Sequence, residues 1–364
     1  MELLRKVNPF QTNIENTKFG ILTTLNAKTE LSAKNSISHG SKSLLANYIY
    51  KKDETYNLVY TIIDKDGKEQ SFVENDGILP TLFLSPDQEN HVSVVPYHPD
   101  KELEICIPVF NRENIKPPKG NRPFTADFIG TSNQFSIFYD VDFWSDKKPD
   151  KLLAIEFKNG LIKKKHNIKV PLPRNNKVFI SNNELHLLSK ENNNWLHRQI
   201  DEKGNEIKQR QFETNQSFYR EILYLSFNKN SFLLNEEDGK ITIDKIDAQG
   251  NCNSIDLFDI GDPFYNTWRP VKIAKDTFVT MFNGEFGNGW LTTKDDQLLE
   301  IFYSKGDNGY KNLLTNEVFE MPIKDLIISS INSTSENAYS VVFYPRTDDS
   351  IKNDKLFILG RDLN

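Results

Sequence analysis

The chain has 364 residues, among them 25 Phe and 13 Tyr but only 3 Met. Aromatic and β-branched residues suit pleated, half-buried surfaces, so this composition favours a β-rich fold. With 45 Lys and Arg against 51 Asp and Glu, the formal net charge is −6, which argues against the basic face that nucleic-acid binding needs. We therefore expect no nucleic-acid partner.

The sequence also gives no sign of export or membrane insertion. The N-terminal segment MELLRKVNPFQTN lacks the apolar core of a signal peptide. No apolar run approaches the roughly 18 residues that a membrane-spanning helix needs. Cys106 stands in an apolar run and Cys252 follows a turn, so neither a disulfide nor a thiolate metal site is expected. We expect a soluble, cytoplasmic protein without a membrane span, and we take it to be a monomer.

The motif Asp-x-x-Gly recurs between two half-apolar runs. It stands at Asp64–Gly67, Asp201–Gly204 and Asp247–Gly250, and Asn159-Gly160 replaces it in a fourth copy. Asp in the first place and Gly in the fourth fit a type I turn, in which Gly accepts the left-handed conformation. Each copy therefore predicts a β-hairpin.

The spacing of these hairpins indicates a repeat. The glycines at 67, 160, 204 and 250 are 93, 44 and 46 residues apart, so the period is about 45 residues and the first gap spans two periods. Segments around Asn111 and Asp295 supply further copies of this hairpin. A second family of seven hairpins alternates with the first along the chain. Two hairpins per period make four strands, which is typical of a β-propeller blade. The predicted fold is all-β, a seven-bladed β-propeller.

The two ends of the chain predict how the disc closes. The last repeat stops after DKLFILGRDLN (354–364), one strand short, whereas FGILTTLN (19–26) is a strand without a blade of its own. We expect residues 19–30 to complete the last blade and remove an open sheet edge, with residues 1–18 as an N-terminal extension. The chain is then a single domain with blades at about 31–77, 78–121, 122–171, 172–216, 217–262, 263–320 and 321–364.

Two alternatives stay open at this point. A β-sandwich with added domains would also be all-β, although it does not explain the sevenfold spacing. Between 290 and 325, either LTTKDDQLLEIF (291–302) is the hairpin of the third and fourth strands of blade six, or Leu298–Ser304 is its third strand. The period favours the first register, which makes residues 304–319 an insertion between blades.

The repeats lack the Gly-His…Trp-Asp, double-glycine and Asp-box signatures of the common propeller families.

One face of the disc is expected to bind a partner. The connections between blades and between second and third strands open on the same face, and they hold most of the long, aromatic or proline-containing segments. Loops on one side of a rigid scaffold usually hold the binding residues, and aromatics and Arg dominate binding hot spots. The alternative for each ring is that it seals a gap between blades. The candidate binding residues are Phe143, Trp144, Phe264, Tyr265, Trp268, Arg269, Phe286 and Trp290.

The leading hypothesis is therefore a non-catalytic binding or scaffold module for a protein or peptide partner. A carbohydrate-active enzyme is the second hypothesis, because propellers acting on sugars place paired acids in the central funnel. Its candidate catalytic acids are Asp127, Asp140, Asp142, Asp262 and Glu285. A structural component of a larger assembly is the third.

No metal or other cofactor is expected. The acidic turns at 64–68 and 236–240 offer too few oxygens for calcium, and the six histidines have no paired metal-ligand spacing.

Overall fold

The computed structural model describes the chain in separate stretches. These are residues 5–28, 31–39, 42–50, 56–64, 69–75, 80–84, 92–96, 107–108, 128–132, 135–139, 151–158, 161–169, 176–181, 184–191, 194–201, 203–213, 222–226, 230–237, 240–259, 261, 271–274, 276–294, 297–306, 308–335, 337–346 and 354–363. Over these residues the regular structure is all strand, as the composition predicts. They include no helix that is long and apolar enough to cross a membrane.

The described strands form seven antiparallel sheets, numbered I to VII here, and the first four lie in the first 213 residues. Sheet I has the order β1 (Arg5–Val7), β7 (Glu69–Asn75), β6 (Tyr56–Asp64), β5 (Lys42–Tyr50), β4 (Leu31–His39). Sheet II has the order β10 (Ile107–Pro108), β9 (Val92–Pro96), β8 (Pro80–Leu84). Sheet III contains β11 (Phe128–Ser132), β12 (Phe135–Tyr139), β13 (Lys151–Lys158) and β14 (Leu161–Lys169). Sheet IV contains β15 (Asn176–Ser181), β16 (Glu184–Glu191), β17 (Asn194–Ile200) and β18 (Glu206–Glu213).

The other three sheets complete the described part of the fold. Sheet V contains β19 (Ile222–Ser226), β20 (Ser231–Glu237), β21 (Lys240–Ile246) and β22 (Cys252–Asp259). Sheet VI contains β23 (Val271–Ala274), β24 (Thr277–Asn283), β25 (Asn288–Lys294), β26 (Gln297–Ser304), β27 (Gly309–Asn312) and β28 (Val318–Glu320). Sheet VII has the order β29 (Leu326–Ser335), β30 (Ala338–Pro345), β31 (Lys355–Asp362), β3 (Gly20–Ala27), β2 (Phe10–Thr17).

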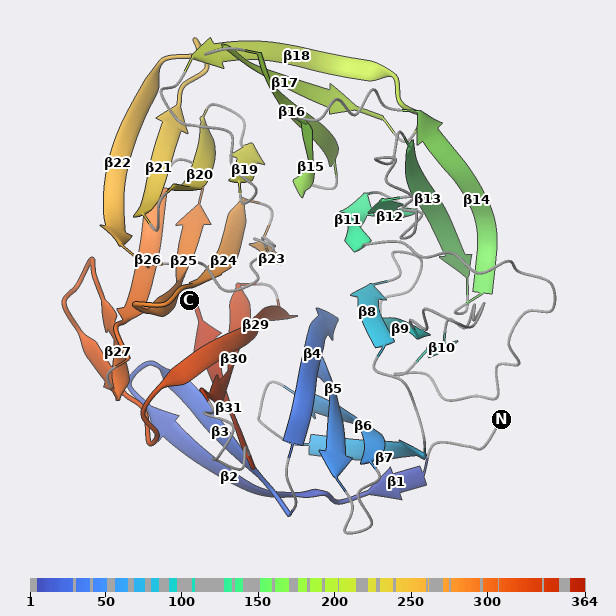
Figure 1. The fold of residues 1–364 in the computed structure, drawn as a ribbon, viewed down its shortest axis with the longest axis vertical. Helices are drawn as coiled ribbons and strands as arrows, with labels where there is room; N and C mark the ends of the chain where they lie inside the picture. Colours follow the sequence, from blue (N-terminus) through green and yellow to red (C-terminus); the bar gives the residue numbers. More distant parts are fainter. Residues whose placement is uncertain are drawn as a thin grey trace.

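The sheets follow one another around a common centre (Figure 1), and each is open rather than closed on itself. One edge strand of every sheet lies nearest that centre: β4, β8, β11, β15, β19, β23 and β29. Strand β4 contacts β8 and β29, and contacts continue from β8 to β11, β15 and β19. On the other side, β29 contacts β23 and β24. Sheets I to V and the pairs VI–VII and VII–I therefore meet through their inner strands.

The core lies between sheets rather than at one centre. Buried clusters join sheet III to IV, sheets IV, V and VI to one another, sheet VI to VII, and sheet VII to I. Strands β24 and β25 in the middle of sheet VI are consequently buried on both faces, with Met281 half-buried and Lys294 exposed at the end of β25. A strand covered on both sides needs no alternation of polar and apolar residues. This accounts for the runs of apolar residues and Thr in the middle of sheet VI.

The N-terminal segment connects the outer edges of two sheets. Strand β3 pairs with β31 over Ile21–Asn26, which is the partner expected from the sequence. Residues 1–18, expected as an extension, contain two strands instead: β1 pairs with β7 of sheet I, and β2 pairs with β3 of sheet VII. The polar sequence of β2 hides this strand, because most of its side chains are exposed and Phe10 alone supplies its buried apolar ring.

Sheet VI settles the register between 290 and 325. Lys294 pairs with Gln297, so β25 and β26 form a hairpin, as the first register requires. The segment after β26 is an ordered extension of the same sheet, because β27 pairs with β26 and β28 pairs with β27. Tyr310 and Phe319 from this hairpin are buried in the cluster between sheets VI and VII. Two rings of the insertion therefore contribute to the core, while its turn, residues 313–318, is exposed.

The two described Asp-x-x-Gly turns have a common geometry. In the second, one Asp247 carboxylate oxygen accepts the backbone N–H groups of Gln249 and Asn251 at 2.8 Å, and the other accepts the Asn251 side-chain amide at 2.7 Å. Gly250 has φ of +90°, and a methyl group there would lie 3.1 Å from the carbonyl oxygen of Gln211 in sheet IV. Glycine is thus required both by the turn and by its contact with the preceding sheet.

The turn between β2 and β3 supplies a test of the N-terminal contribution. Phe19 is buried there and meets Phe302 and Phe319 edge-on, with ring centroids 5.8 and 5.3 Å away. We expect Phe19→Ala to lower the free energy of unfolding by about 3–5 kcal/mol, because it removes a buried ring from this junction. The matched control is Ile14→Ala on β2, where the side chain is 45% exposed and the expected change is about 0.5 kcal/mol or less. Chemical denaturation measures both, and equal stability of the two variants would contradict this role.

Candidate functional site

The structure describes part of the residues expected at the binding face. Phe286 and Trp290 are described, and so is Glu285 among the candidate acids. The other candidates lie outside the described residues, and their roles stay predictions: Phe143, Trp144, Phe264, Tyr265, Trp268, Arg269, Asp127, Asp140, Asp142 and Asp262.

The connection between β24 and β25 is a tight hairpin turn, residues 284–287, which we name the Phe286 turn. The N–H of Gly284 donates to the carbonyl of Gly287 at 2.8 Å, and the N–H of Gly287 donates back at 3.3 Å. Glu285 and Phe286 are therefore the two residues at its tip, and both are exposed. Gly287 is needed for packing rather than for flexibility, because a methyl group there would lie 2.2 Å from the carbonyl oxygen of Ser304.

Phe286 is a large apolar ring on the surface, 54% exposed. Its covered side lies against Gly261, which has φ of +69°. A methyl group at Gly261 would be 2.9 Å from the Cβ of Glu285 and 3.1 Å from the Phe286 ring. The crossing from sheet V to sheet VI, which starts at this glycine, therefore touches the Phe286 turn, as expected for two connections on the same face.

Two side chains of sheet VI connect this turn to the backbone of the neighbouring sheets V and VII. The Tyr303 hydroxyl, beside Gly287, donates to the backbone carbonyl of Asp259 at the end of sheet V, at 2.9 Å. Burial, together with the nearby Asp259, raises the pKa of Tyr303 and keeps this donor protonated. The base of the turn is tied to β29, because the Asn288 amide donates to the Leu326 carbonyl at 2.7 Å. These hydrogen bonds fix the base of the Phe286 turn, from which Glu285 and Phe286 project.

One exposed cation lies beside the turn. Arg346, which follows β30, donates from its guanidinium to the carbonyl of Gly284 at 3.4 Å, and its backbone N–H donates to the carbonyl of Asp325 at 2.6 Å. The sequence analysis did not single out Arg346. Its proximity to Gly284 depends on the packing of sheet VII against sheet VI, which no local pattern reports.

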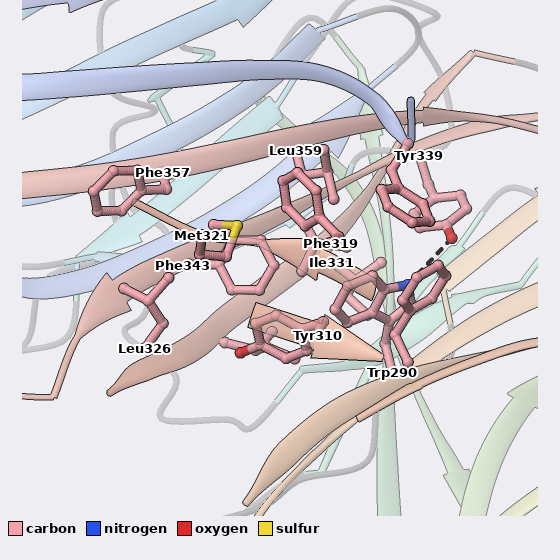
Figure 2. Packing of buried hydrophobic residues seen from close by; sticks show 14 of the residues in the cluster. Trp290, Tyr310, Phe319, Met321, Leu326, Ile331, Tyr339, Phe343, Phe357 and Leu359 are labelled. Atoms are coloured by element: carbon pink, nitrogen blue, oxygen red, sulfur yellow. Dashed lines mark hydrogen bonds between the residues drawn. The ribbon is translucent and has the colours of Figure 1, made fainter. Parts of the chain in front are cut away.

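Trp290 is a core residue, so its expected place on the binding face is wrong. It is completely buried and stacks on Phe302, with ring centroids 4.6 Å apart. Its indole N–H donates to the Tyr339 hydroxyl at 3.2 Å, as Figure 2 shows. Position 290 lies within β25 and not in the turn before it, and its side chain enters the junction between sheets VI and VII. For this ring, the alternative of sealing a gap between sheets is the correct one.

The one candidate catalytic acid that the structure describes, Glu285, does not support the enzymatic hypothesis. Glu285 occupies the exposed tip of a hairpin turn, where an acidic residue needs no catalytic role. Within the described stretches, no group of three or more His, Cys, Asp or Glu is placed to hold a metal ion.

Comparisons with known proteins identify no family. No protein-family model matches the chain, and no curated protein matches its sequence. Among solved structures, the WD40 domain of Toxoplasma gondii coronin is 8% identical, with 100% of this chain and 89% of that chain covered and a TM-score of 0.46. The WD40 domain of SCAP from fission yeast is 11% identical, with 96% and 98% covered and a TM-score of 0.42. The β-propeller domain of the Trilobed protease from Pyrococcus furiosus is 8% identical, with 95% and 96% covered and a TM-score of 0.35.

The opposite environments of Phe286 and Trp290 lead to a direct test. We expect Trp290→Ala to cost about 3–5 kcal/mol of unfolding free energy, since it leaves a cavity and removes the hydrogen bond that the Tyr339 hydroxyl accepts. Phe286→Ala should cost about 1 kcal/mol or less, because half of that ring is already in water. Urea titrations of the two variants make the comparison. A large loss in Phe286→Ala would show that this ring is structural, and a small loss in Trp290→Ala would refute its place in the core.

Proposed function

We propose that the chain is a single-domain, seven-bladed β-propeller, with sheets I to VII as its blades and residues 19–30 as the closing segment. The contacts among the inner strands support this, as does the pairing of β3 with β31 in the sheet that also holds β29 and β30. The contact of β29 with β4 supports closure from the inner side, because it joins the last sheet to the first. The proposed blade boundaries are those expected from the repeat.

We propose further that this disc is a non-catalytic binding module for a protein or peptide partner. The observation that supports it best is the Phe286 turn, in which an aromatic ring that is 54% exposed stands at the tip of a tight hairpin. Exposing such a ring is unfavourable in water, whereas aromatic anchors dominate the energy of protein interfaces. A fixed base also lowers the entropy lost when a partner is bound.

The proposed surface extends from Phe286 toward the crossing between sheets V and VI. Gly261 is in contact with Phe286 and directly precedes the segment DPFYNTWRP (262–270). That contact supports the prediction that the aromatic residues of the segment share a surface with Phe286. Arg346 supplies a cation beside the turn, since its guanidinium donates to the carbonyl of Gly284. An aromatic anchor beside an arginine is a common composition for an interface centre.

Partner capture with two matched variants tests this function. Phe286→Ala removes the proposed anchor, and Ile207→Ala removes an apolar side chain that is 61% exposed on the outer strand β18. We expect proteins captured from the native cell extract by the unaltered chain to be retained by Ile207→Ala and lost by Phe286→Ala. For a purified partner, Phe286→Ala should weaken binding by about 5- to 150-fold, the range of about 1–3 kcal/mol for a hot-spot residue.

The contrary result is equally clear. If every captured protein binds Phe286→Ala as tightly as the unaltered chain, while the variant keeps its stability, the Phe286 turn is not the binding site.

A further inference from the structure

Sheet IV contains a buried pair of histidines that the proposed function does not use. His186 on β16 and His197 on β17 are 2% and 5% exposed. Nδ1 of His186 and Nε2 of His197 are 2.9 Å apart and share one hydrogen bond. Such a bond needs hydrogen on one of the two facing nitrogens and a lone pair on the other. A second proton between them would place two N–H groups head to head.

The pair lies in the junction between sheets IV and V. Side chains alternate along a strand and cross-strand partners share a face, so His197 shares its face with its partner Leu188 and with Trp195. Leu188 and Trp195 belong to the buried cluster that includes Leu233 and Ile246, which share one face of sheet V. The histidines are therefore on the face of sheet IV that packs against sheet V.

Arg210 forms hydrogen bonds across this junction. Arg210 on β18 is the cross-strand partner of His197. Its guanidinium donates to the Ser231 hydroxyl of sheet V at 2.6 Å and to the Asp247 carbonyl at 3.3 Å. Any positive charge formed on His197 would thus arise beside a cation that already joins the two sheets.

The other charged groups around the pair come from both sheets. In sheet IV, Lys208 adds a second cation near His197, while a carboxylate oxygen of Glu184 lies 3.8 Å from Nε2 of His186. In sheet V, strand alternation puts Asp244, Cys252 and Asp256 on the same face as Ser231. The Asp244 carboxylate accepts a hydrogen bond from the Ser254 hydroxyl at 2.5 Å and lies close enough to Cys252 to help raise that thiol's pKa.

Protonation of His197 is strongly disfavoured while the junction is closed. Burial, followed by the charges of His186, Arg210 and Lys208, lowers the pKa of His197 from 6.5 to about 3. A histidine with a lowered pKa stays neutral in the folded state, while an open state takes up a proton below about pH 6.5. Stability at this junction is therefore full above pH 6.5 and is lost progressively as the pH falls toward 3.

We propose that the His186–His197 pair makes the junction between sheets IV and V acid-sensitive, so that its opening equilibrium rises at mildly acidic pH while that of the junction between sheets VI and VII changes little. The two junctions differ in their histidines, because no histidine follows His197 in the sequence. The Asp247 carboxylate does not interfere in this pH range, since hydrogen bonding from Asn251 lowers its pKa below an already low ordinary value.

Hydrogen exchange at pH 7.5 and 5.5, corrected for intrinsic rates, tests the proposal. We expect the opening equilibrium reported by residues 194–200 and 240–246 to rise about tenfold if His197 alone takes up a proton, and more if both histidines do. The opening equilibrium reported by residues 288–294 and 338–345 should change less than about twofold. An equal change at both junctions, or none at either, overturns the proposal.

A double variant removes the titration and keeps hydrogen-bonding groups. His186→Gln with His197→Gln should show the same protection of residues 194–200 at both pH values. If this variant keeps the acid response of the unaltered chain, the histidines are not its cause and the proposal is wrong. If the variant does not fold, the comparison of the two junctions in the unaltered chain decides.

Discussion

A chain of polar groups joins sheets VI and VII to the N-terminal turn. The Arg361 guanidinium pairs with the Glu300 carboxylate, which also accepts a hydrogen bond from the Tyr339 hydroxyl at 2.5 Å, and Tyr339 accepts the Trp290 indole N–H. Arg361 also donates to the carbonyl of Phe19 at 2.5 Å, and its guanidinium lies 5.2 Å from the centre of the Phe302 ring. One arginine thereby joins a strand of sheet VI, two strands of sheet VII and the N-terminal turn. A largely buried ion pair of this kind adds little net stability by itself, but loss of either partner leaves an uncompensated charge in the junction.

Distributing the core over the junctions has two consequences for function. Each sheet is stabilised chiefly by its neighbours, so a single junction can differ in polarity and respond to its own conditions, as the histidine pair between sheets IV and V illustrates. The loops and turns that connect the strands also do not have to form a hydrophobic core themselves. The Phe286 turn shows this division: Asn288 and Tyr303 hold its base, while Phe286 is left at the surface.

Local chemistry explains how much of this could be predicted from sequence. The strands and hairpins around Asp201 and Asp247 were predictable, because an aspartate and a glycine three residues apart encode the turn wherever it stands. The exposure of Phe286 followed from its position in a turn between two strands. Trp290, four residues later, could not be placed in the same way, since the strand that contains it is buried on both faces and has no alternation. Strand β2 was missed because its sequence is polar and its pairing with β3 places it in the sheet. The histidine pair was missed because the contact between two histidines eleven residues apart depends on how their strands pair.

The N-terminal hairpin is proposed to complete the last sheet and to stabilise the ring of sheets. We would test this by unfolding a chain that lacks residues 1–27, with a chain lacking only residues 1–4 as the control. Removing β3 leaves β31 as an unpaired edge and takes Phe19, Leu22 and Leu25 out of the junctions. The account predicts a large fall in the unfolding midpoint and faster hydrogen exchange in β31 for the long truncation, and neither for the short one. An unchanged midpoint in the chain lacking residues 1–27 would contradict it.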